Sequence, residues 1–434
     1  MRKIAIATLG CKVNQFESAS FSSSLTRAGC EVVPFAGRAD IYVINTCAVT
    51  GRAGQQSRQL IRRAMKTNPA ARLIITGCYA QTASRDIMEI TDSRSVCIVG
   101  NGNKDQVLDA ALAENEYDLP LSDIGVKREI CRLPVRRFNG RTRAFLRIQD
   151  GCNNFCSYCI VPHTRGRSRS LALPDVLEQA AIFSEEGYRE LVITGINVGK
   201  YGQDLDEDET IYTLLARLCR EFPVMRFRLS SIEPTEVNDS LLELMIGAPN
   251  FMPHLHIPLQ SGDDTILRRM NRHYPVATFA RAVRQSHAAL PHVAIGCDIL
   301  SGFPGEDNTA HENTLQLLAD LPVTYLHVFP FSRRPGTPAA SMQDQVPKHI
   351  KAERVRQLRD LGHEKKLEFY RRHVGTTRQV LAERHNKETG RLKGFSENYI
   401  PVQFQGPARL AGQVVAIRID RLEIDEPYGT LQNE

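Results

Sequence analysis

Apolar runs of strand length alternate with amphipathic segments along the first 125 residues. The runs KIAIATLG, DIYVINT and RLIITG are rich in β-branched residues, and helical patterns such as QSRQLIRRAMKT lie between them. Such alternation is the pattern of a parallel sheet with helices on its faces. Residues 1–125 are therefore predicted to form an N-terminal parallel α/β domain.

The same alternation returns in the central part of the chain, where it repeats six times. Residues 138–372 are predicted to form a partial (β/α)6 barrel, ending in a long charged helix over residues 347–373. The six strand-length runs are AFLRIQ, ELVITGIN, MRFRLSSI, HLHIPLQ, VAIGCDILSG and YLHVFPFS.

After Gly375 the pattern changes to short strands separated by turn residues, including TRQVLAE and QVVAIRID. This spacing predicts a small antiparallel β-barrel over residues 375–434, of the OB-like kind that often binds RNA. Because 434 residues are too many for one hydrophobic core, the expected fold class is α/β with these three domains.

The composition is that of a soluble globular protein, with 42% hydrophobic and 24% charged residues. No run of about eighteen apolar residues and no signal-peptide pattern occurs, so we expect neither a membrane span nor export. The odd number of cysteines, 11, argues against a disulfide framework. A reducing, cytoplasmic compartment is therefore expected, with thiols that are free or bind metal.

Three cysteines, Cys152, Cys156 and Cys159, lie within one short loop directly after the first predicted barrel strand. A structural zinc site needs four ligands, usually in two Cys-x2-Cys pairs, and the chain has no second such pair. A four-iron cluster held by three cysteines instead leaves one iron open to bind another molecule. The loop would place that cluster in the barrel mouth.

A second group of cysteines, Cys11, Cys47 and Cys78, follows the three predicted N-terminal strands in turn. Parallel strands end at the same edge of their sheet, so the three sulfurs should lie along one rim, where such sheets bind ligands. Each could instead be a buried small hydrophobic residue. The repeated position favours a second metal-binding group. The remaining thiols, including Cys131, Cys219 and Cys297, are interpreted as structural.

Basic residues are concentrated on both sides of the cysteine loop. This excess indicates a polyanionic ligand, and nucleic acid is favoured over a merely solvated surface. The candidate RNA contacts are Arg136, Arg137, Arg141 and Arg143, and the wider basic tract includes Lys127, Arg128, Arg132, Arg147, Arg165, Arg167 and Arg169.

The spacing in CNNFCSYC resembles the signature of radical S-adenosylmethionine (SAM) enzymes. Together with the N-terminal cysteines, it makes nearly the whole chain similar to the radical SAM methylthiotransferases, which have an N-terminal methylthiotransferase domain, a radical SAM barrel and a C-terminal TRAM domain. The motifs LGCKVNQFES, NTCAVT and GCYAQ resemble the MtaB type, which acts on threonylcarbamoyladenosine beside the tRNA anticodon. The isopentenyladenosine type usually has a GCQMN-like first motif and the ribosomal-protein type GCPKN. His163 and Ser301 depart from the usual tyrosine and valine.

The resemblance implies two 4Fe-4S clusters and SAM as cofactors. It also implies that SAM is cleaved to a 5′-deoxyadenosyl radical, which abstracts the hydrogen from adenine C2. That C–H bond has no acidity that a side-chain base could use at neutral pH. The N-terminal cluster would hold the sulfur that is methylated and transferred. The implied partners are the tRNA anticodon loop, an electron donor such as a flavodoxin- or ferredoxin-type protein, and a sulfur source.

Candidate SAM contacts come from the same resemblance and from polar residues at the ends of the predicted barrel strands. They are Tyr158, Gly195, Asn197, Ser231, Glu233, Gln260, Ser261 and Asp298. For Gly195 and Asn197, the alternative is an ordinary glycine turn that ends a strand. His254 and His256 are interpreted as packed or hydrogen-bonded core residues, because no third ligand is visible in the sequence.

Two other functions remain open. A non-catalytic metal- or RNA-binding protein could hold zinc in these cysteines, although it would need a fourth ligand at each site. A methylthiotransferase of the same class could instead act on isopentenyladenosine in tRNA or on a ribosomal protein.

Overall fold

The computed structural model describes residues 1–91, 96–113, 121, 123–205 and 209–432. Its N-terminal unit, residues 1–113, contains a wholly parallel five-stranded sheet with the strand order β2-β1-β3-β4-β5. The strands are β1 (Lys3–Thr8), β2 (Glu31–Val33), β3 (Ile41–Thr46), β4 (Arg72–Gly77) and β5 (Val96–Val99). The three predicted strands are confirmed as β1, β3 and β4.

Helices cover both faces of this sheet. Phe16 and Leu25 of α1 pack with Ile4 in one apolar core, whereas Ile61 of α2 packs with Ile75 in the other. The helices of the unit are α1 (Lys12–Arg27), α2 (Gly51–Thr67), α3 (Cys78–Thr82), α4 (Ser84–Thr91), the 3₁₀ helix η1 (Asn101–Gln106) and α5 (Val107–Leu112).

The central unit, residues 138–372, contains the six predicted strands, which form an arc of two parallel sheets. The sheet β10-β9-β6 and the sheet β11-β12-β13 are joined through parallel bridges from Phe227 to Phe251 and from Ser231 to His256. The strands are β6 (Ala144–Arg147), β9 (Glu190–Thr194), β10 (Arg226–Leu229), β11 (His254–His256), β12 (Ala294–Ser301) and β13 (Tyr325–Pro330), and β7 (Gln149–Asp150) pairs with β8 (Arg169–Ser170) beside them. The unit is therefore a partial barrel with β6 and β13 at its two edges.

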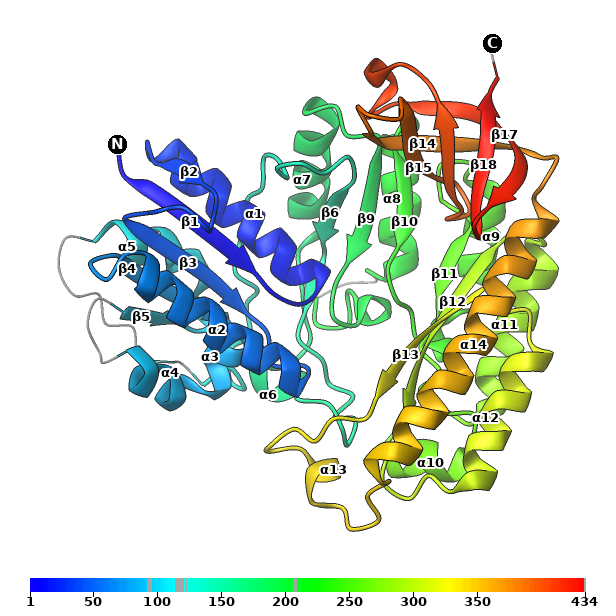
Figure 1. Ribbon diagram of the computed structural model, residues 1–434, viewed down its shortest axis with the longest axis horizontal. Coiled ribbons are helices and arrows are strands. Elements are labelled where there is room, and N and C mark those ends of the chain that lie inside the picture. The colour runs from blue at the N-terminus through cyan, green and yellow to red at the C-terminus, as the bar shows by residue number, and fades with distance from the viewer. Residues whose placement is uncertain (92–95, 114–120, 122, 206–208, 433–434) are drawn as a thin grey trace.

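Helices pack on the outside of the arc, and the long predicted helix is present as α14 (Figure 1). Val176, Leu214, Phe279 and Leu358 from four of these helices share one apolar core with the strands. The helices are α6 (Val161–Arg165), α7 (Leu173–Glu185), η2 (Val198–Lys200), α8 (Ile211–Glu221), η3 (Pro234–Glu236), α9 (Asp239–Gly247), α10 (Asp264–Arg269), α11 (Val276–Ala289), α12 (Asn308–Asp320), α13 (Pro338–Ser341) and α14 (Lys348–Arg372). None of the described helices is long and apolar enough to cross a membrane.

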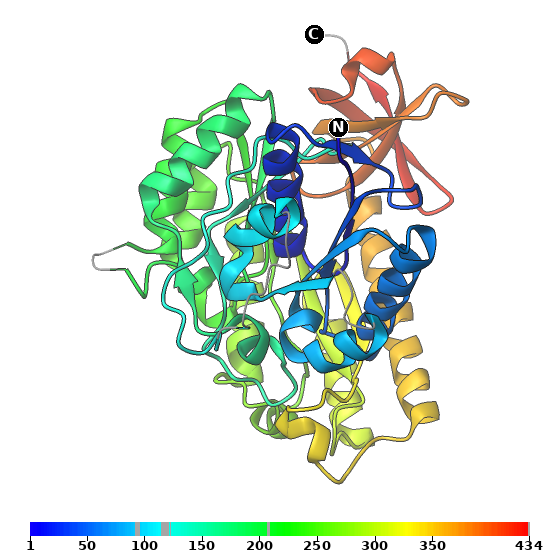
Figure 2. The same ribbon diagram turned by 90° about the vertical axis from the view of Figure 1, so that its left-hand side faces the viewer.

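The N-terminal unit spans the open side of this arc (Figure 2). Its helix α1 packs against the edge strand β6. On the other side, Nη1 of Arg334, which follows β13, donates to the carbonyl of Ala48 at 3.4 Å, and N of Gly51 donates to Oγ of Ser332 at 3.4 Å. The carboxyl edge of the N-terminal sheet therefore faces the interior of the partial barrel.

The C-terminal barrel, residues 375–432, is a closed barrel of five strands in the order β14-β15-β16-β18-β17. The pair β16–β18 is parallel, so the prediction of an entirely antiparallel barrel was wrong. The closing strand β18 was not predicted, because Gly429 and Pro427 weaken its strand pattern. The elements are β14 (Thr377–His385), β15 (Arg391–Ser396), β16 (Pro401–Gln405), η4 (Ala408–Leu410), β17 (Val414–Glu423) and β18 (Glu426–Leu431).

Candidate active site

The first cysteine group lies in the loop between β7 and α6, at the carboxyl end of the barrel's edge strand. N of Cys152 donates to the carbonyl of Gly166 at 3.1 Å, and N of Cys159 donates to the carbonyl of Cys156 at 2.9 Å. Cys156 is buried, whereas the other two cysteines are partly exposed. One ordered loop thus presents three sulfurs at the end of a (β/α) barrel where active sites form.

Hydrogen-bond donors surround the sulfurs of this loop. Nδ2 of Asn197 lies 3.9 Å from Sγ of Cys152, and the backbone N of Asn154 lies 3.5 Å from the same sulfur. Nη1 of Arg272 lies 3.3 Å from Sγ of Cys156. Donors facing cysteine sulfurs are a common feature of iron–sulfur sites, where they adjust the properties of the cluster.

The second cysteine group lies at the carboxyl edge of the N-terminal sheet, as predicted. Cys11 caps α1, Cys47 follows β3, and Cys78 begins α3. Gly10 has a φ of +94°, and a Cβ there would lie 2.8 Å from Sγ of Cys47, so a side chain would fill the space beside that sulfur. Nδ2 of Asn101 lies 3.9 Å from Sγ of Cys78. The backbone of Gly10 therefore packs closely against Cys47, and an amide donor lies beside Cys78.

Four of the six thiols, those of Cys11, Cys47, Cys152 and Cys159, have a raised pKa. Burial raises the pKa of Cys159 to about 12 and that of Cys47 to about 11. Burial also raises the pKa of Cys11, although the charge of Arg165 acts in the opposite direction. A cysteine nucleophile needs a lowered pKa, so these four thiols are not suited to nucleophilic catalysis. A coordinating metal removes the thiol proton, which leaves ligation as the compatible role.

The spacing of the sulfurs does not match a single tetrahedral ion. Within the described part of the chain, no three cysteine sulfurs lie within 4.8 Å of one another. A tetrahedral zinc ion with bonds of about 2.3 Å would need its sulfurs closer together than that. The donor set of three thiols at each position, with an asparagine amide beside one of the sulfurs, fits a polynuclear iron–sulfur cluster.

The two cysteine groups lie side by side. Helix α3, which begins at Cys78, packs against α6, which follows the cysteine loop of the barrel. Ile160 shares an apolar core with Tyr79, and Nδ2 of Asn101 donates to the carbonyl of Thr164 at 2.7 Å. These contacts hold the elements that carry the two cysteine groups against each other.

A buried ionic network holds this junction together. Arg165 of α6 pairs with Glu17 of α1 at 3.0 Å and with Asp150 at 2.8 Å, and Lys104 also pairs with Glu17. Burial alone would raise the pKa of the Asp150 carboxyl, but Arg165 and Arg169 outweigh it and hold that pKa below its usual range. The pKa of Glu17 is lowered against its burial by Arg165 and Lys104. The cysteine loop is thus fixed to α1, the helix that begins beside Cys11.

This network corrects part of the predicted RNA surface. Arg147, Arg165 and Arg169 are 1%, 0% and 2% exposed, so they cannot contact phosphates. Arg147 donates to the carbonyl of Cys131, and Arg169 donates to that of Glu129 at 3.2 Å. Their charges are compensated inside the protein, and the basic tract overstated the positive surface.

Four of the candidate SAM contacts lie in or beside the cysteine loop: Tyr158, Gly195, Asn197 and Glu233. Asn197 contacts Cys152 as described, and Glu233 forms an ion pair with Arg272, the side chain that donates to Cys156. A Cβ at Gly195 would lie 2.9 Å from Oε1 of Gln149, so the backbone approaches the loop closely there. The ring of Tyr158 packs edge-on against Phe303 at 6.5 Å.

The other candidate SAM contacts lie farther along the strands. Oγ of Ser261 accepts a hydrogen bond from N of Asp263 in a turn, Gln260 pairs with β12, and Ser231 is exposed beside β11. Asp298 lies inside the barrel between His256, at 3.0 Å, and His327, at 3.4 Å. The sequence showed no third ligand near His256, but in the structure the ligand atoms of His256, Asp298 and His327 lie within 4.8 Å of one another. The prediction that His256 is hydrogen-bonded is confirmed.

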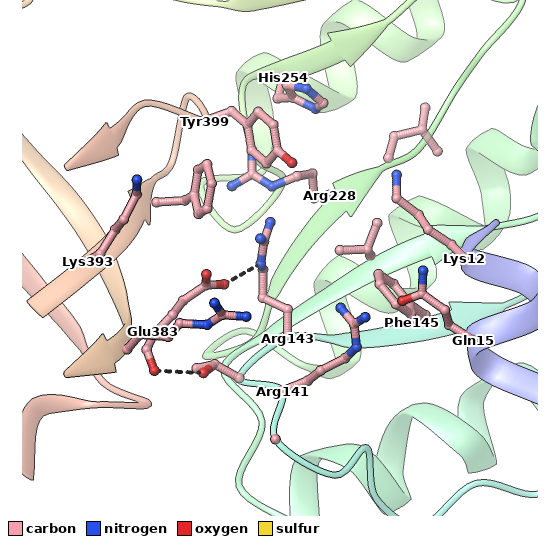
Figure 3. A pocket seen from close by; sticks show the side chains of 16 residues that line it. Lys12, Gln15, Arg141, Arg143, Phe145, Arg228, His254, Glu383, Lys393 and Tyr399 are labelled. Carbon is pink, nitrogen blue, oxygen red and sulfur yellow. Dashed lines mark hydrogen bonds and ion pairs between the residues drawn. The ribbon is translucent and has the colours of Figure 1, made fainter. Parts of the chain in front are cut away.

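A cavity of about 490 Å³ opens where the three units meet (Figure 3). Lys12 reaches into it from α1, Arg141 and Arg143 from the start of β6, and Tyr399 from the C-terminal barrel. Of the four candidate RNA contacts, Arg141 and Arg143 therefore line this cavity. Arg136 is paired with Glu186 at 2.6 Å on the outer surface, and Arg137 is also exposed.

Comparison with known proteins identifies the family. Residues 3–100 match the uncharacterized protein family UPF0004, and residues 146–318 match the radical SAM superfamily. A threonylcarbamoyladenosine tRNA methylthiotransferase, MtaB, from Bacillus subtilis strain 168 is 39% identical over 99% of this chain and 95% of its own length. The chain belongs to the MtaB family of radical SAM methylthiotransferases. Radical SAM enzymes use SAM and a 4Fe-4S cluster, and both belong to this enzyme's cofactors.

Other relatives of this methylthiotransferase are more distant. A tRNA-2-methylthio-N6-dimethylallyladenosine synthase from Xylella fastidiosa strain M23 is 34% identical over 96% of this chain and 87% of its own length. Among solved structures, the radical SAM methyltransferase TsrM from Kitasatospora setae has a TM-score of 0.58 at 14% identity, and the match covers 78% of this chain and 77% of that one. The structural likeness shows a shared radical SAM fold.

Several residues of the methylthiotransferase site escaped sequence reasoning. Arg272 contacts the cysteine loop from more than a hundred residues away, and Arg228 and Tyr399 come together only through the packing of the C-terminal barrel. None of these residues has a sequence pattern that marks it. Lys12 could have been noticed, because it directly follows Cys11.

Proposed function

We propose that this enzyme transfers a methylthio group to C2 of N6-threonylcarbamoyladenosine next to the anticodon of tRNA. The observation that carries the proposal is the placement of two cysteine groups side by side, at the interior of a partial barrel that opens to a cation-lined cavity. The named activity of the Bacillus subtilis relative, at 39% identity over nearly the full length, supports the same substrate.

Each cysteine group has a distinct role in this proposal. Cys152, Cys156 and Cys159 would hold the 4Fe-4S cluster that binds SAM, with Asn197 and Arg272 donating toward its sulfurs. Cys11, Cys47 and Cys78 would hold a second 4Fe-4S cluster, which carries the transferred sulfur. When bound, the first cluster and SAM supply a hydrogen-abstracting radical. The remaining candidate SAM contacts stay proposals of the same kind.

The RNA-binding surface is proposed to consist of the cavity rim and the C-terminal barrel, interpreted as an OB-like TRAM domain. An enzyme that modifies C2 has to draw the base out of its stack. Phe395 and Tyr399 stack on each other with centroids 4.8 Å apart, and Tyr399 has a strained φ of +66° at the cavity wall. Aromatic rings so placed can receive an extruded base. Arg136 and Arg137 are proposed as outer phosphate contacts.

The division into domains over residues 1–125, 138–372 and 375–434 belongs to the same proposal. The proposal also includes a cytoplasmic location, a flavodoxin- or ferredoxin-type electron donor and a separate sulfur source.

Dimethylallyladenosine is the second candidate substrate, since the Xylella fastidiosa relative at 34% identity is named for it. The cavity argues against it, because six cationic side chains line it and a dimethylallyl group is uncharged. Anaerobically reconstituted enzyme should therefore convert an anticodon stem-loop containing threonylcarbamoyladenosine to its 2-methylthio derivative, detected by nucleoside mass spectrometry. Conversion of only the dimethylallyl RNA would contradict the proposed substrate. A colourless protein free of iron would contradict the enzyme class.

A further inference from the structure

The cavity where the three units meet has a marked excess of positive charge. Six cationic side chains line it against a single carboxylate, that of Glu383. They are Lys12, Arg141, Arg143, Arg228, Arg384 and Lys393. Like charges brought together around a water-filled space stabilise an anion bound between them.

Three of these cations already have partners within the protein. Arg143 pairs with Glu383 at 2.7 Å, Arg228 pairs with Glu190 at 2.7 Å, and Lys393 pairs with Glu426 at 2.7 Å. Across the described ranges of the chain, Lys12, Arg141 and Arg384 form no ion pair. These three unpaired side chains are therefore available to bind an anionic ligand.

The three unpaired cations lie on different walls of the cavity. Arg384 comes from the C-terminal barrel, and Arg141 precedes β6, with its guanidinium 5.2 Å from the centre of the Phe145 ring. Lys12 comes from the first turn of α1, immediately after Cys11. It lies within the electrostatic reach of Arg143 and Arg228. Lys12 is therefore the free cation adjacent to the cysteine group that would carry the sulfur.

We propose that Lys12 binds the carboxylate on the N6 substituent of the target base and thereby selects an anionic substituent over an uncharged one. This inference rests on the proposed function. In adenine, C2 and C6 are both bonded to N1, so a base whose C2 faces Cys11 presents its N6 substituent along the same edge. A threonylcarbamoyl group ends in a carboxylate, which an ammonium group binds with a charge-assisted hydrogen bond.

An RNA phosphate is the other source of an anion at this position, and the experiment separates the two. Binding of the anaerobically reconstituted enzyme is measured by fluorescence anisotropy with three anticodon stem-loops. They carry threonylcarbamoyladenosine, its uncharged methyl ester, or plain adenosine at the target position. The Lys12→Gln variant should bind the first RNA about 10- to 100-fold more weakly than the unsubstituted enzyme, with little change for the other two.

Arg384→Gln is the matched control, because it removes an unpaired cation from the wall that the C-terminal barrel forms. It should weaken binding of all three RNAs by the same factor. Lys12→Arg keeps the charge and should retain the preference for the carboxylate, which separates charge from folding. Iron content reports whether Cys11 still binds its cluster in each variant, and SAM cleavage without RNA reports whether the barrel site is intact.

An equal loss with all three RNAs in Lys12→Gln would overturn the inference in favour of a phosphate contact. An unsubstituted enzyme that binds the acid and the methyl ester equally well would overturn it too. Neither result affects the proposed function, which fails only if the threonylcarbamoyl RNA is not thiomethylated.

Discussion

The two cysteine groups reach their positions by different routes. Cys152, Cys156 and Cys159 share one loop, so their proximity follows from chain connectivity. Cys11, Cys47 and Cys78 come from the ends of three strands, and only the parallel pairing of β1, β3 and β4 brings them together. A local loop and a sheet edge can therefore present similar sets of three thiols.

The two cysteine groups also have similar polar side chains near their sulfurs. Each group has one asparagine amide 3.9 Å from a sulfur, from Asn197 in the barrel and Asn101 in the N-terminal unit. An arginine stands near each group, since Arg272 donates to Cys156 and the charge of Arg165 acts on Cys11 and Cys78. The residues beside the two groups differ. Glu233 and other candidate SAM contacts adjoin the barrel group, whereas Lys12, which lines the cavity, directly follows Cys11 of the other group.

The largest expected effect is the loss of the barrel cluster. Replacing Cys152, Cys156 and Cys159 with alanine should abolish both SAM cleavage and thiomethylation, because no other described site combines three thiols with the candidate SAM contacts. Iron should fall to about half of the eight or so atoms expected for two four-iron clusters. Iron analysis measures the metal content, and chromatography of 5′-deoxyadenosine measures SAM cleavage. The control is Cys219→Ala, a buried thiol away from both groups; persisting SAM cleavage in the triple variant would contradict the assignment.

The same change in the other group should separate the two roles. With Cys11, Cys47 and Cys78 replaced by alanine, about half the iron should again be lost and the methylthio product should disappear. SAM cleavage to 5′-deoxyadenosine should persist, because the barrel loop is intact. Full iron content in this variant would show that the N-terminal group holds no cluster.

The junction between the groups should be sensitive to Arg165. The Arg165→Met variant leaves Glu17 and Asp150 buried without their shared partner, and removing one partner of a buried ion pair costs about 3–5 kcal/mol. Both carboxyls have a lowered pKa in the folded protein. Their stabilisation is therefore fully present above the unfolded-state pKa of about 4 and is lost as the pH falls through the lower folded values.

Thermal denaturation of both proteins between pH 3 and about pH 8 tests this expectation. The difference in stability between the unsubstituted protein and Arg165→Met should be largest near neutral pH and should shrink below about pH 4. The surface variant Arg136→Met, which breaks only the exposed pair with Glu186, should change stability far less than Arg165→Met. A difference that stays constant with pH would show that the carboxylates are not its source.

The smallest expected effect concerns the RNA phosphates at the cavity rim. Replacing Arg141 and Arg384 with glutamine should reduce the salt dependence of RNA binding by about 0.7 in the log–log slope for each phosphate that is no longer neutralised. Filter binding at several salt concentrations measures this slope. Truncation after Val374 is a poorer test, because Leu367, Phe369 and Tyr370 of α14 pack into the C-terminal barrel and would become exposed. An unchanged slope would remove these arginines from the RNA surface.

The sequence by itself determined most of the helices and strands and the spacing of the loop cysteines. The alternation of apolar runs predicted β1, β3, β4 and all six strands of the partial barrel, because strand burial imposes a pattern on neighbouring residues. It also predicted α14. The loop cysteines were recognisable for the same reason, since metal ligands on one loop have a characteristic spacing.

Only the tertiary structure decided which charges are available to a ligand. Arg165 and Arg141 look alike in a basic tract, yet Arg165 pairs with Glu17 nearly 150 residues away and is completely buried, whereas Arg141 is exposed at the cavity. The cavity itself joins Lys12, Arg228 and Tyr399, which come from three separate units. The local sequence does not show such pairings, because the electrostatic energy of a charged side chain depends on all the groups packed around it in the fold.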